Sequence, residues 1–514
     1  MIFACLDSRF SRQSTGRDGA GAVRPSSAPE AIAGVLLVLS LAGLARVAVD
    51  PSPYLTSGFR LDRITAAVAL FVAGIGLAAV RYATRCLEAQ PRHQRLMAWM
   101  AAATVASWLL TLSDSFVAMV LAWLTLGLCL QRMLSWSWHA DSAPLRTRFP
   151  WWWSVAGDAM LALAFGLAWA AYGSTDLTSA VEHMAADPTV AWPTAIILLA
   201  TGACAIKSAQ VPLHGWLPRT VDAPTPVSAL MHAGIINAGG VLLVRMAPAI
   251  ERVPEAWMLM SIVASASMLV AVPTAWFQSK AKSALAWSTV GQMGFMMAQC
   301  GLCAFPAAFL HVLGHGTYKA WSFLGAGEVT RMRHSQATPA RTLALLAIGA
   351  MSSLAGLAAV VWMLGVPFPS TPGKLALTAV VGIATGQCWV ALLGDPGLRS
   401  RRASRALLAA ALSVTLPAVA LTLYLAAAAW IGMSAEAGQQ HAGPVAWIAA
   451  IVPVLTIACL AVLHALMPHL EGHPLGLRLR VHATNGFYVA MLVNRTARHP
   501  HPTHRPINPG AAHA

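Results

Sequence analysis

Apolar runs close to 20 residues long recur along most of the chain, separated by short polar connections. A helix needs about 20 apolar residues to cross the hydrocarbon core of a bilayer. The pattern therefore predicts an all-α polytopic membrane protein with about 14 transmembrane helices. The predicted helices cover residues 31–49, 62–83, 96–112, 115–134, 151–172, 190–209, 226–247, 256–276, 283–303, 304–328, 341–364, 375–393, 406–430 and 445–468.

Prolines interrupt one of these helical regions. Pro212, Pro218, Pro224 and Pro226 follow Lys207 closely. Proline has no amide hydrogen to donate and cannot stand repeatedly inside a helix, so we expect a broken helix near 207–226. Membrane proteins tolerate such breaks where the backbone is buried in protein or lines a watery cavity.

The chain divides into three parts. Residues 1–30 are rich in Ser, Gly and Arg, lack the apolar core of a secretory signal peptide, and predict a polar cytoplasmic tail. Residues 31–468 form the predicted transmembrane domain. Residues 469–514 contain no further apolar span and predict a basic cytoplasmic tail without a long lateral helix.

Composition and charge support this division. Of the 514 residues, 57% are hydrophobic and 10% charged, whereas soluble proteins have about 25% charged residues. The net charge of +15 does not indicate nucleic-acid binding, because the basic residues stand in short connections. They gather on alternate connections, and the opposite ones, such as 173–189, are nearly free of them, so both termini are expected in the cytoplasm of a bacterial cell, with the chain in the inner membrane. The basic residues concerned are Arg9, Arg12, Arg17, Arg24, Arg85, Arg92, Arg95, Arg146, Arg148, Arg219, Lys280, Lys282, Arg331, Arg333, Arg399, Arg401, Arg402, Arg405, Arg478, Arg480, Arg495 and Arg498.

Nothing in the sequence indicates a cofactor, a metal site or a redox centre. There are eight cysteines, and Cys300 and Cys303 form a CxxC inside an apolar run with no second pair nearby, which favours packing over metal binding. The chain has no Rossmann glycine pattern, flavin signature or cluster-binding cysteine run. We expect a transporter subunit rather than an enzyme with its own redox chemistry.

Ionisable residues inside the apolar runs are the candidates for function. Such a side chain costs about 2.5–3.5 kcal/mol at the bilayer centre, so each indicates a partner, water or a function. Lys207 ends the run IILLATGACAIKSAQ just before the predicted break. A lysine at a helix end can also extend to the interface, so that alternative stays open.

A second candidate is a stripe of three residues. His311, His315 and Lys319 stand at i, i+4 and i+8, on one side of a helix. The two histidines could share a zinc ion, but no third ligand stands nearby and the lysine would repel a cation. Two satisfied core histidines are the other alternative. We favour a proton relay, because burial disfavours the charged forms and eases proton release.

Three further residues are less distinctive. His232 lies among small residues in PVSALMHAGIINAGG, and close helix packing explains the small residues but not the histidine. Asp158 and Lys282 each begin an apolar run. Either could anchor a helix end at the interface or belong to a proton path.

Three segments resemble the central motifs of the proton-translocating transporter family, which includes antiporter-like subunits of respiratory complex I (subunit L type) and cation/proton antiporter subunits. They are KSAQVPLHGWLPRTVDAPTPVSALMHAGIINAGG, AKSALAWSTVGQMGF and FLHVLGHGTYKAWSFLGAGEV. A weaker similarity extends to FRLDRITA and to Gly157 and Asp158. The resemblance implies an antiporter-like fold.

The resemblance also implies a proton pathway along a polar axis at mid-membrane, with Lys207 as the lysine of the broken helix. In complex I subunits a glutamate on the fourth helix pairs with that lysine, but here LAWLTLGLCL places Leu124 at that position. We therefore expect Lys207 to lack that partner. The family's second broken-helix lysine has no clear match, and Lys374 is the local candidate. The predicted pathway residues are Lys207, His232, Lys282, His311, His315, Lys319 and Asp158.

The chain also resembles the membrane subunits of energy-coupled inorganic carbon pumps, the DabB-type proteins. Three features carry this resemblance: the missing helix-four glutamate, the segment HAGIINAGG and the C-terminal segment LRLRVHATNGFYVAMLVNR. Such a subunit works with a large soluble, zinc-binding DabA-type subunit that resembles a carbonic anhydrase. The resemblance implies that the chain lends a proton or sodium gradient to CO2 hydration or bicarbonate accumulation by a partner on the cytoplasmic face. The alternative is a proton-pumping subunit of NADH-quinone oxidoreductase or of a multisubunit cation/proton antiporter. A purely structural scaffold is disfavoured by the buried His and Lys residues.

Overall fold

Helices make up most of the part of the chain that the structure describes. The computed structural model describes residues 28–136, 152–325, 338–394, 402–433 and 443–496, apart from 57, 89, 91, 92, 188, 190, 366, 367 and 471. The long helices are α2 (Ala28–Val49), α3 (Arg63–Cys86), α4 (His93–Leu112), α5 (Phe116–Trp136), α6 (Trp152–Tyr172), α12 (Pro254–Trp276), α13 (Ala281–Gly301), α14 (Phe305–Leu324), α15 (Pro339–Leu364), α16 (Pro372–Leu393), α17 (Arg402–Ile431) and α18 (Pro444–Leu470). The shorter elements are β1 (Tyr54–Thr56), β2 (Phe59–Leu61), α7 (Leu177–Ala186), α8 (Ala191–Lys207), α9 (Thr225–Leu230), α10 (Ala238–Arg245), α11 (Ala247–Ile250), α19 (Pro474–Thr484) and α20 (Val489–Thr496).

The predicted all-α membrane fold is confirmed. Ten of the described helices are long and apolar enough to cross a membrane. Each predicted segment overlaps one helix, except that 226–247 corresponds to α9, a π-helical turn at Met231–Ile235 and α10 in succession. The total of fourteen spans is compatible with this arrangement and stays a prediction.

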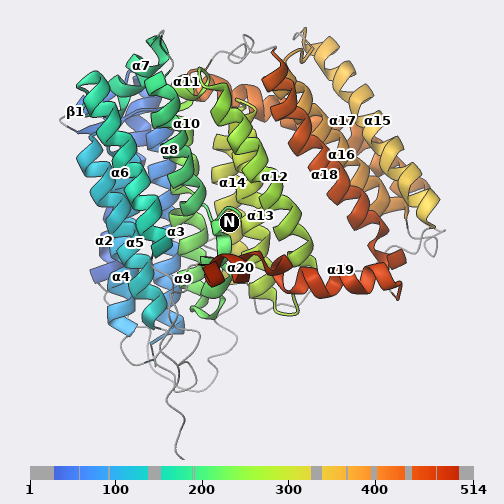
Figure 1. The fold of residues 1–514 in the computed structure, drawn as a ribbon, viewed down its shortest axis with the longest axis horizontal. Coiled ribbons are helices and arrows are strands. Elements are labelled where there is room, and N and C mark those ends of the chain that lie inside the picture. Colours follow the sequence, from blue (N-terminus) through green and yellow to red (C-terminus); the bar gives the residue numbers. More distant parts are fainter. Residues whose placement is uncertain are drawn as a thin grey trace, which may run out of the picture.

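The helices stand side by side, as Figure 1 shows, with α2–α6 at one side, α8–α14 in the middle and α15–α18 at the other side. Helix α12 packs along α13 and α18, and α15 packs along α16 and α17. Helices α19 and α20 cross one end of the bundle (Figure 1). They contain 11 and 8 residues, so neither is a long lateral helix.

Helix ends follow local sequence signals. Asp62 caps α3, because its side chain accepts a hydrogen bond from the Thr65 amide while the Thr65 hydroxyl accepts one from the Asp62 amide. Thr338 caps α15, because its hydroxyl accepts a hydrogen bond from the Arg341 amide, and proline stands at the first helical position. Gly365 ends α15 at a φ of 62°, in the left-handed region that favours glycine.

Two groups of basic residues that the sequence predicts on the cytoplasmic side lie at the same end of the bundle. Lys280 and Lys282 lie at the α12–α13 connection, and Arg478 and Arg480 lie on α19. These two elements meet at one end of the bundle, since the Gln278 side chain donates a 3.3 Å hydrogen bond to the Thr484 carbonyl at the end of α19. The predicted basic residues Arg9, Arg12, Arg17, Arg24, Arg92, Arg146, Arg148, Arg331, Arg333, Arg399, Arg401 and Arg498 lie outside the described residues.

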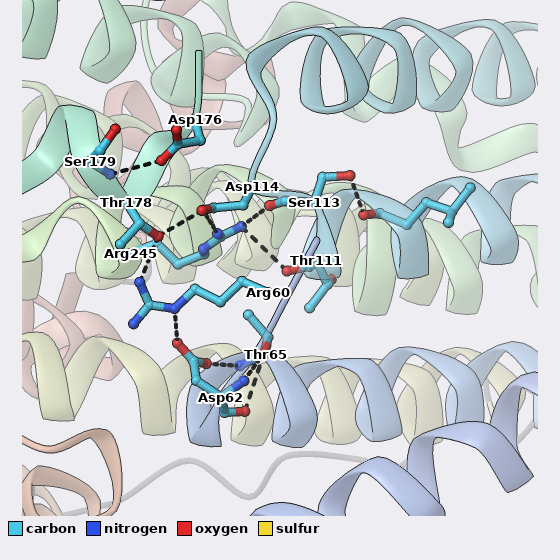
Figure 2. Close-up of polar contacts among 11 residues, drawn as sticks. Arg60, Asp62, Thr65, Thr111, Ser113, Asp114, Asp176, Thr178, Ser179 and Arg245 are labelled. Atoms are coloured by element: carbon cyan, nitrogen blue, oxygen red, sulfur yellow. Dashed lines mark hydrogen bonds and ion pairs between the residues drawn. The ribbon is translucent and has the colours of Figure 1, made fainter. Parts of the chain in front are cut away.

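The opposite end is not as free of arginine as the sequence pattern suggested, and three of the arginines that the structure describes there pair with carboxylates, whereas Arg63 donates to the Ala429 carbonyl. Arg245, at the end of α10, donates a 2.8 Å hydrogen bond to Asp114, between α4 and α5. Thr178 on α7 also donates to Asp114 (2.9 Å) and accepts from Arg60 on β2 (2.6 Å). Arg60 in turn pairs with Asp62 at 2.7 Å. Figure 2 shows this chain of contacts joining β2, α3, α7 and α10. Positive charge at this end is therefore neutralised locally.

This network predicts a large stability effect. Asp114→Asn should destabilise the protein by about 3–5 kcal/mol, because it leaves the buried Arg245 guanidinium without a counter-charge. Tryptophan fluorescence during thermal unfolding in detergent measures the effect. The matched control is Asp50→Asn, which breaks the exposed Arg46–Asp50 pair at 3.4 Å and should leave the unfolding temperature unchanged. Equal effects of the two substitutions would contradict a special role for the buried network.

Candidate functional site

The predicted broken helix is confirmed. Helix α8 ends at Lys207, and α9 begins at Thr225. The connection contains two short 3-10 helices, η2 (Leu213–Trp216) and η3 (Pro218–Asp222). The prolines explain why an α-helix does not continue through this stretch.

Neighbouring groups satisfy the backbone of the break. The Gln210 amide donates to the Ala205 carbonyl at 2.9 Å, and the Val211 amide donates to the Ser267 hydroxyl of α12 at 3.0 Å. The Trp216 indole donates to the Ile206 carbonyl at 3.1 Å. These bonds replace the helical ones that are lost, as burial away from water requires.

Lys207 is buried, with 8% of its surface exposed, so the alternative of a lysine extending to the interface is wrong. Its ammonium group donates to the Trp123 carbonyl at 3.2 Å and lies 4.6 Å from the centre of the Trp123 ring. Asp158 on α6 lies 3.9 Å away from the same nitrogen. Lys207 therefore lacks the glutamate partner on α5, as expected, and its acidic neighbour is a carboxylate on α6.

A cavity of about 190 Å³ surrounds this pair. Its lining includes Leu124, Ser154 and Trp216 as well as Asp158 and Lys207. Ser154 donates a 3.3 Å hydrogen bond to Asp158. The volume and the polar groups suit several water molecules, so the pair can exchange protons with water.

The predicted stripe on α14 is also confirmed as a geometric feature. The rings of His311 and His315 lie 5.8 Å apart. Lys319, one turn further, is fully buried and donates to the Leu285 carbonyl (3.0 Å) and the Ser288 hydroxyl (2.9 Å), both on α13. Lys319 is thus held by neutral oxygens among the described residues, unlike Lys207.

His232 joins this stripe from the π-helical turn and stacks on Phe323 of α14 at 4.4 Å. π-Helical turns are frequent at functional sites. Neither ring nitrogen of His315 has a hydrogen-bond partner among the described residues, nor does Nδ1 of His232. That observation disfavours the alternative of satisfied core histidines. Within the described part of the chain, no third His, Cys, Asp or Glu joins His311 and His315 in a group able to hold a metal ion.

Two polar side chains connect the Lys207 region with the α14 stripe. Ser208, next to Lys207, donates to the Ile236 carbonyl at 3.1 Å. Asn237 donates to the Val312 carbonyl of α14 at 3.2 Å. The predicted groups other than Lys282 therefore form two clusters, and these two hydrogen bonds hold the break and α14 to the segment that contains Ile236 and Asn237.

Lys282 stands apart from both clusters. It lies in the first turn of α13 and donates to the Ala223 carbonyl at 2.8 Å, next to the start of α9. This contact ties α13 to the far end of the break. A place for Lys282 in the proton pathway stays a prediction.

The sequence did not single out several ionisable residues that the structure buries. Arg245 and Asp114 form the network described above. Glu251, between α11 and α12, has a carboxylate oxygen with no hydrogen-bond partner among the described residues, and burial raises the pKa of this carboxyl to about 7. Lys374 lies in the first turn of α16, which is continuous to Leu393, so no second broken helix is centred on it. Only neighbours distant in sequence identify Arg245, Asp114 and Glu251 as buried.

Comparison with known families agrees with the resemblance of the motifs. Residues 113–394 match the family described as NADH:quinone oxidoreductase/Mrp antiporter, transmembrane. A chain of the Mrp complex from Dietzia sp. DQ12-45-1b superposes with a TM-score of 0.57 and 25% sequence identity, over 91% of this chain and 57% of that chain.

Individual relatives come from two groups. The probable inorganic carbon transporter subunit DabB2 of Halothiobacillus neapolitanus is 28% identical over 86% of this chain and 80% of its own length. The probable subunit DabB1 of the same organism is 37% identical over 52% of this chain and 49% of its own length. NADH-quinone oxidoreductase subunit L of Mycobacterium tuberculosis is 30% identical over 54% of this chain and 44% of its own length. The chain thus spans about half the length of several relatives that it matches.

The contact between Lys207 and Asp158 predicts energetic coupling. Lys207→Ala and Asp158→Ala should each destabilise the protein, because each leaves one buried charge without its partner. The double variant should be less destabilised than the sum of the single variants, with a coupling energy of about 0.5–3 kcal/mol. Thermal unfolding of all four proteins in detergent gives this value. Strict additivity would show that the two side chains do not interact.

Proposed function

Because the chain belongs to the NADH:quinone oxidoreductase/Mrp antiporter transmembrane family, we propose that it conducts protons as the membrane subunit of an energy-coupled inorganic carbon pump. Its partner in this proposal is a large soluble, zinc-binding subunit related to carbonic anhydrase. The ion gradient drives CO2 hydration or bicarbonate accumulation by that partner. Sodium is the alternative ion.

The observation that carries the proposal is the presence of two clusters of buried and half-buried titratable groups in the membrane domain. Asp158 and Lys207 form one cluster, and the α14 stripe with His232 forms the other. Charged groups inside a membrane are costly and are retained for function. Lys207 can pass a proton to Asp158 or to water in its cavity, and the histidine rings with free nitrogens can accept and donate protons in turn.

Two observations favour a carbon pump over the second candidate, a subunit of NADH-quinone oxidoreductase or of an Mrp-type antiporter. The alignment with DabB2 covers 86% of this chain, whereas the alignment with subunit L covers 54% of it. Leu124 also replaces the glutamate that complex I subunits use. The second candidate is favoured by the structural likeness to the Mrp complex. A neighbouring gene for a large zinc-binding protein would support the pump, and a full set of dehydrogenase genes would support the second candidate.

The position of basic residues supports a cytoplasmic partner. Arg478 and Arg480 are exposed on α19, at the end of the bundle that also holds Lys280. Exposed Leu475 and Leu477 stand beside these arginines. By the positive-inside rule this end faces the cytoplasm of the inner membrane. A mixed basic and apolar surface suits an acidic protein partner with apolar contacts.

The proposal predicts that Lys207→Ala abolishes energy-coupled carbon uptake without preventing membrane insertion. Lys319→Arg should also abolish uptake, because arginine holds its proton too tightly to relay it. Growth in air of a bacterial strain without carbonic anhydrase, with the chain and its soluble partner co-expressed, measures function. Membrane fractionation measures insertion, and exposed Lys280→Ala is the matched control. Full growth of the Lys207→Ala strain would contradict a central role of this lysine. Full growth of the Lys319→Arg strain would indicate that Lys319 acts as a fixed charge and not as a proton relay.

A separate prediction concerns the partner. The double charge reversal Arg478→Glu/Arg480→Glu should abolish co-purification of the soluble subunit from detergent, because it replaces attraction to an acidic surface by repulsion. Arg95→Glu, an exposed arginine on α4, is the control and should not change co-purification. If the arginines only bind anionic lipid, co-purification stays unchanged and the docking surface lies elsewhere.

A further inference from the structure

The C-terminal segment after α18 packs on the membrane domain itself. Residues 474–496 comprise α19, a short 3-10 turn η6 (Gly486–Tyr488) and α20, and are called the C-terminal strap below. Figure 1 shows the strap crossing the end of the bundle, with α20 in front of the central helices. It contacts α12, α18 and, through α20, the 3-10 helix η2 of the break. The strap therefore connects elements that are far apart in the sequence.

The strap turns against α13 at a position that requires glycine. Gly486 has a φ of +60°, where side chains are strained. A Cβ atom at Gly486 would also lie 2.7 Å from the Trp287 ring of α13. The Trp287 ring also lies 5.2 Å from the ring of His214, which belongs to η2. Trp287 is thus shared between the strap and the break.

A second contact is direct. A Cβ atom at Gly215 of η2 would lie 2.9 Å from the Cβ of Ala490 on α20. The next residue, Trp216, lines the cavity around Lys207 and Asp158 and donates to the Ile206 carbonyl. Two residue steps therefore separate the strap from the wall of the proton site.

We infer that the C-terminal strap is a positioning element that holds η2, and with it Trp216, against the Lys207–Asp158 site. Contact of α20 with Gly215 and of Gly486 with Trp287 fixes the break at the cytoplasmic end. A displacement of the strap moves the wall of the Lys207 cavity, because Ala490 lies against Gly215 and the next residue, Trp216, lines that cavity. On the proposed function, the docked soluble subunit causes that displacement, so docking and proton transfer are coupled through the strap.

The contact between Gly215 and Ala490 allows a compensating pair of substitutions. Gly215→Ala places a methyl group against the Ala490 methyl and should displace η2. Uptake should fall about tenfold or more, since displacements near 1 Å at a reacting site have effects of this size or larger. Gly215→Ala/Ala490→Gly removes the opposing methyl and should return uptake to within about twofold of the wild type. Gly166→Ala is the control, because a Cβ there meets no atom within 4 Å.

Hydrogen exchange of the purified chain in detergent gives a readout that does not depend on transport. Gly215→Ala should speed amide exchange in residues 208–224, and the double variant should restore it. Ala490→Leu, which enlarges the strap side of the contact, tests the same displacement if Gly215→Ala does not fold.

The outcomes separate this inference from the proposed function. If Lys207→Ala abolishes uptake while Gly215→Ala and Ala490→Leu leave both uptake and exchange unchanged, the strap has no positioning role and the proposed function stands. If Lys207→Ala keeps full uptake, the proposed function fails, and the exchange data still decide whether the strap holds the break. If the double variant shows no more uptake and no slower amide exchange than Gly215→Ala, the contact with Ala490 is not the cause of the defect.

Discussion

A helix that breaks inside a membrane exposes backbone groups that lipid cannot hydrogen-bond, and the arrangement around residues 208–224 follows from this constraint. The break is surrounded by protein on several sides. Helix α12 provides the Ser267 hydroxyl for the Val211 amide, and α13 provides the Lys282 ammonium for the Ala223 carbonyl. The indole of Trp216 satisfies the carbonyl of Ile206, just before the break. Helices α12 and α13 therefore pack beside α8–α10 not only to bury apolar surface but to replace lost helical hydrogen bonds.

The charged side chains inside the protein form two kinds of ion pair, one close and one further apart. Arg245 and Asp114 are joined at 2.8 Å, and Thr178 adds a further bond, which suits a fixed clamp between loops and helices. Lys207 and Asp158 lie 3.9 Å apart beside a cavity with room for water. The greater distance and the cavity distinguish this pair from the close Arg245–Asp114 pair. Lys319, held by a carbonyl and a hydroxyl, has partners that also accept a neutral amine as donor.

The acidic neighbour of Lys207, the lysine of the broken helix, stands on a different helix from the glutamate of complex I subunits. Leu124 on α5 cannot pair with Lys207, and Asp158 reaches the same cavity from α6. A carboxylate therefore lies near the Lys207 ammonium group although α5 does not provide it. The wall of this cavity also includes Trp216, which links it to η2 and, through η2, to α20.

The sequence by itself determined the class of the fold, the break and the stripe on α14. The features that predict them are the length of the apolar runs, the clustered prolines and the i, i+4, i+8 spacing. Each is a local property of the sequence, so it can be recognised without knowing which residues pack against it. Only the tertiary structure decided that Asp158 partners Lys207, that Arg245 is matched by Asp114, and that Ala490 touches Gly215. Each of these pairs joins residues separated by 49 or more positions, and helix packing sets such distances through side-chain shape. Lys282 illustrates the limit: the sequence placed it at the start of an apolar run and left its role open, and only packing shows that its ammonium group lies at the end of the break.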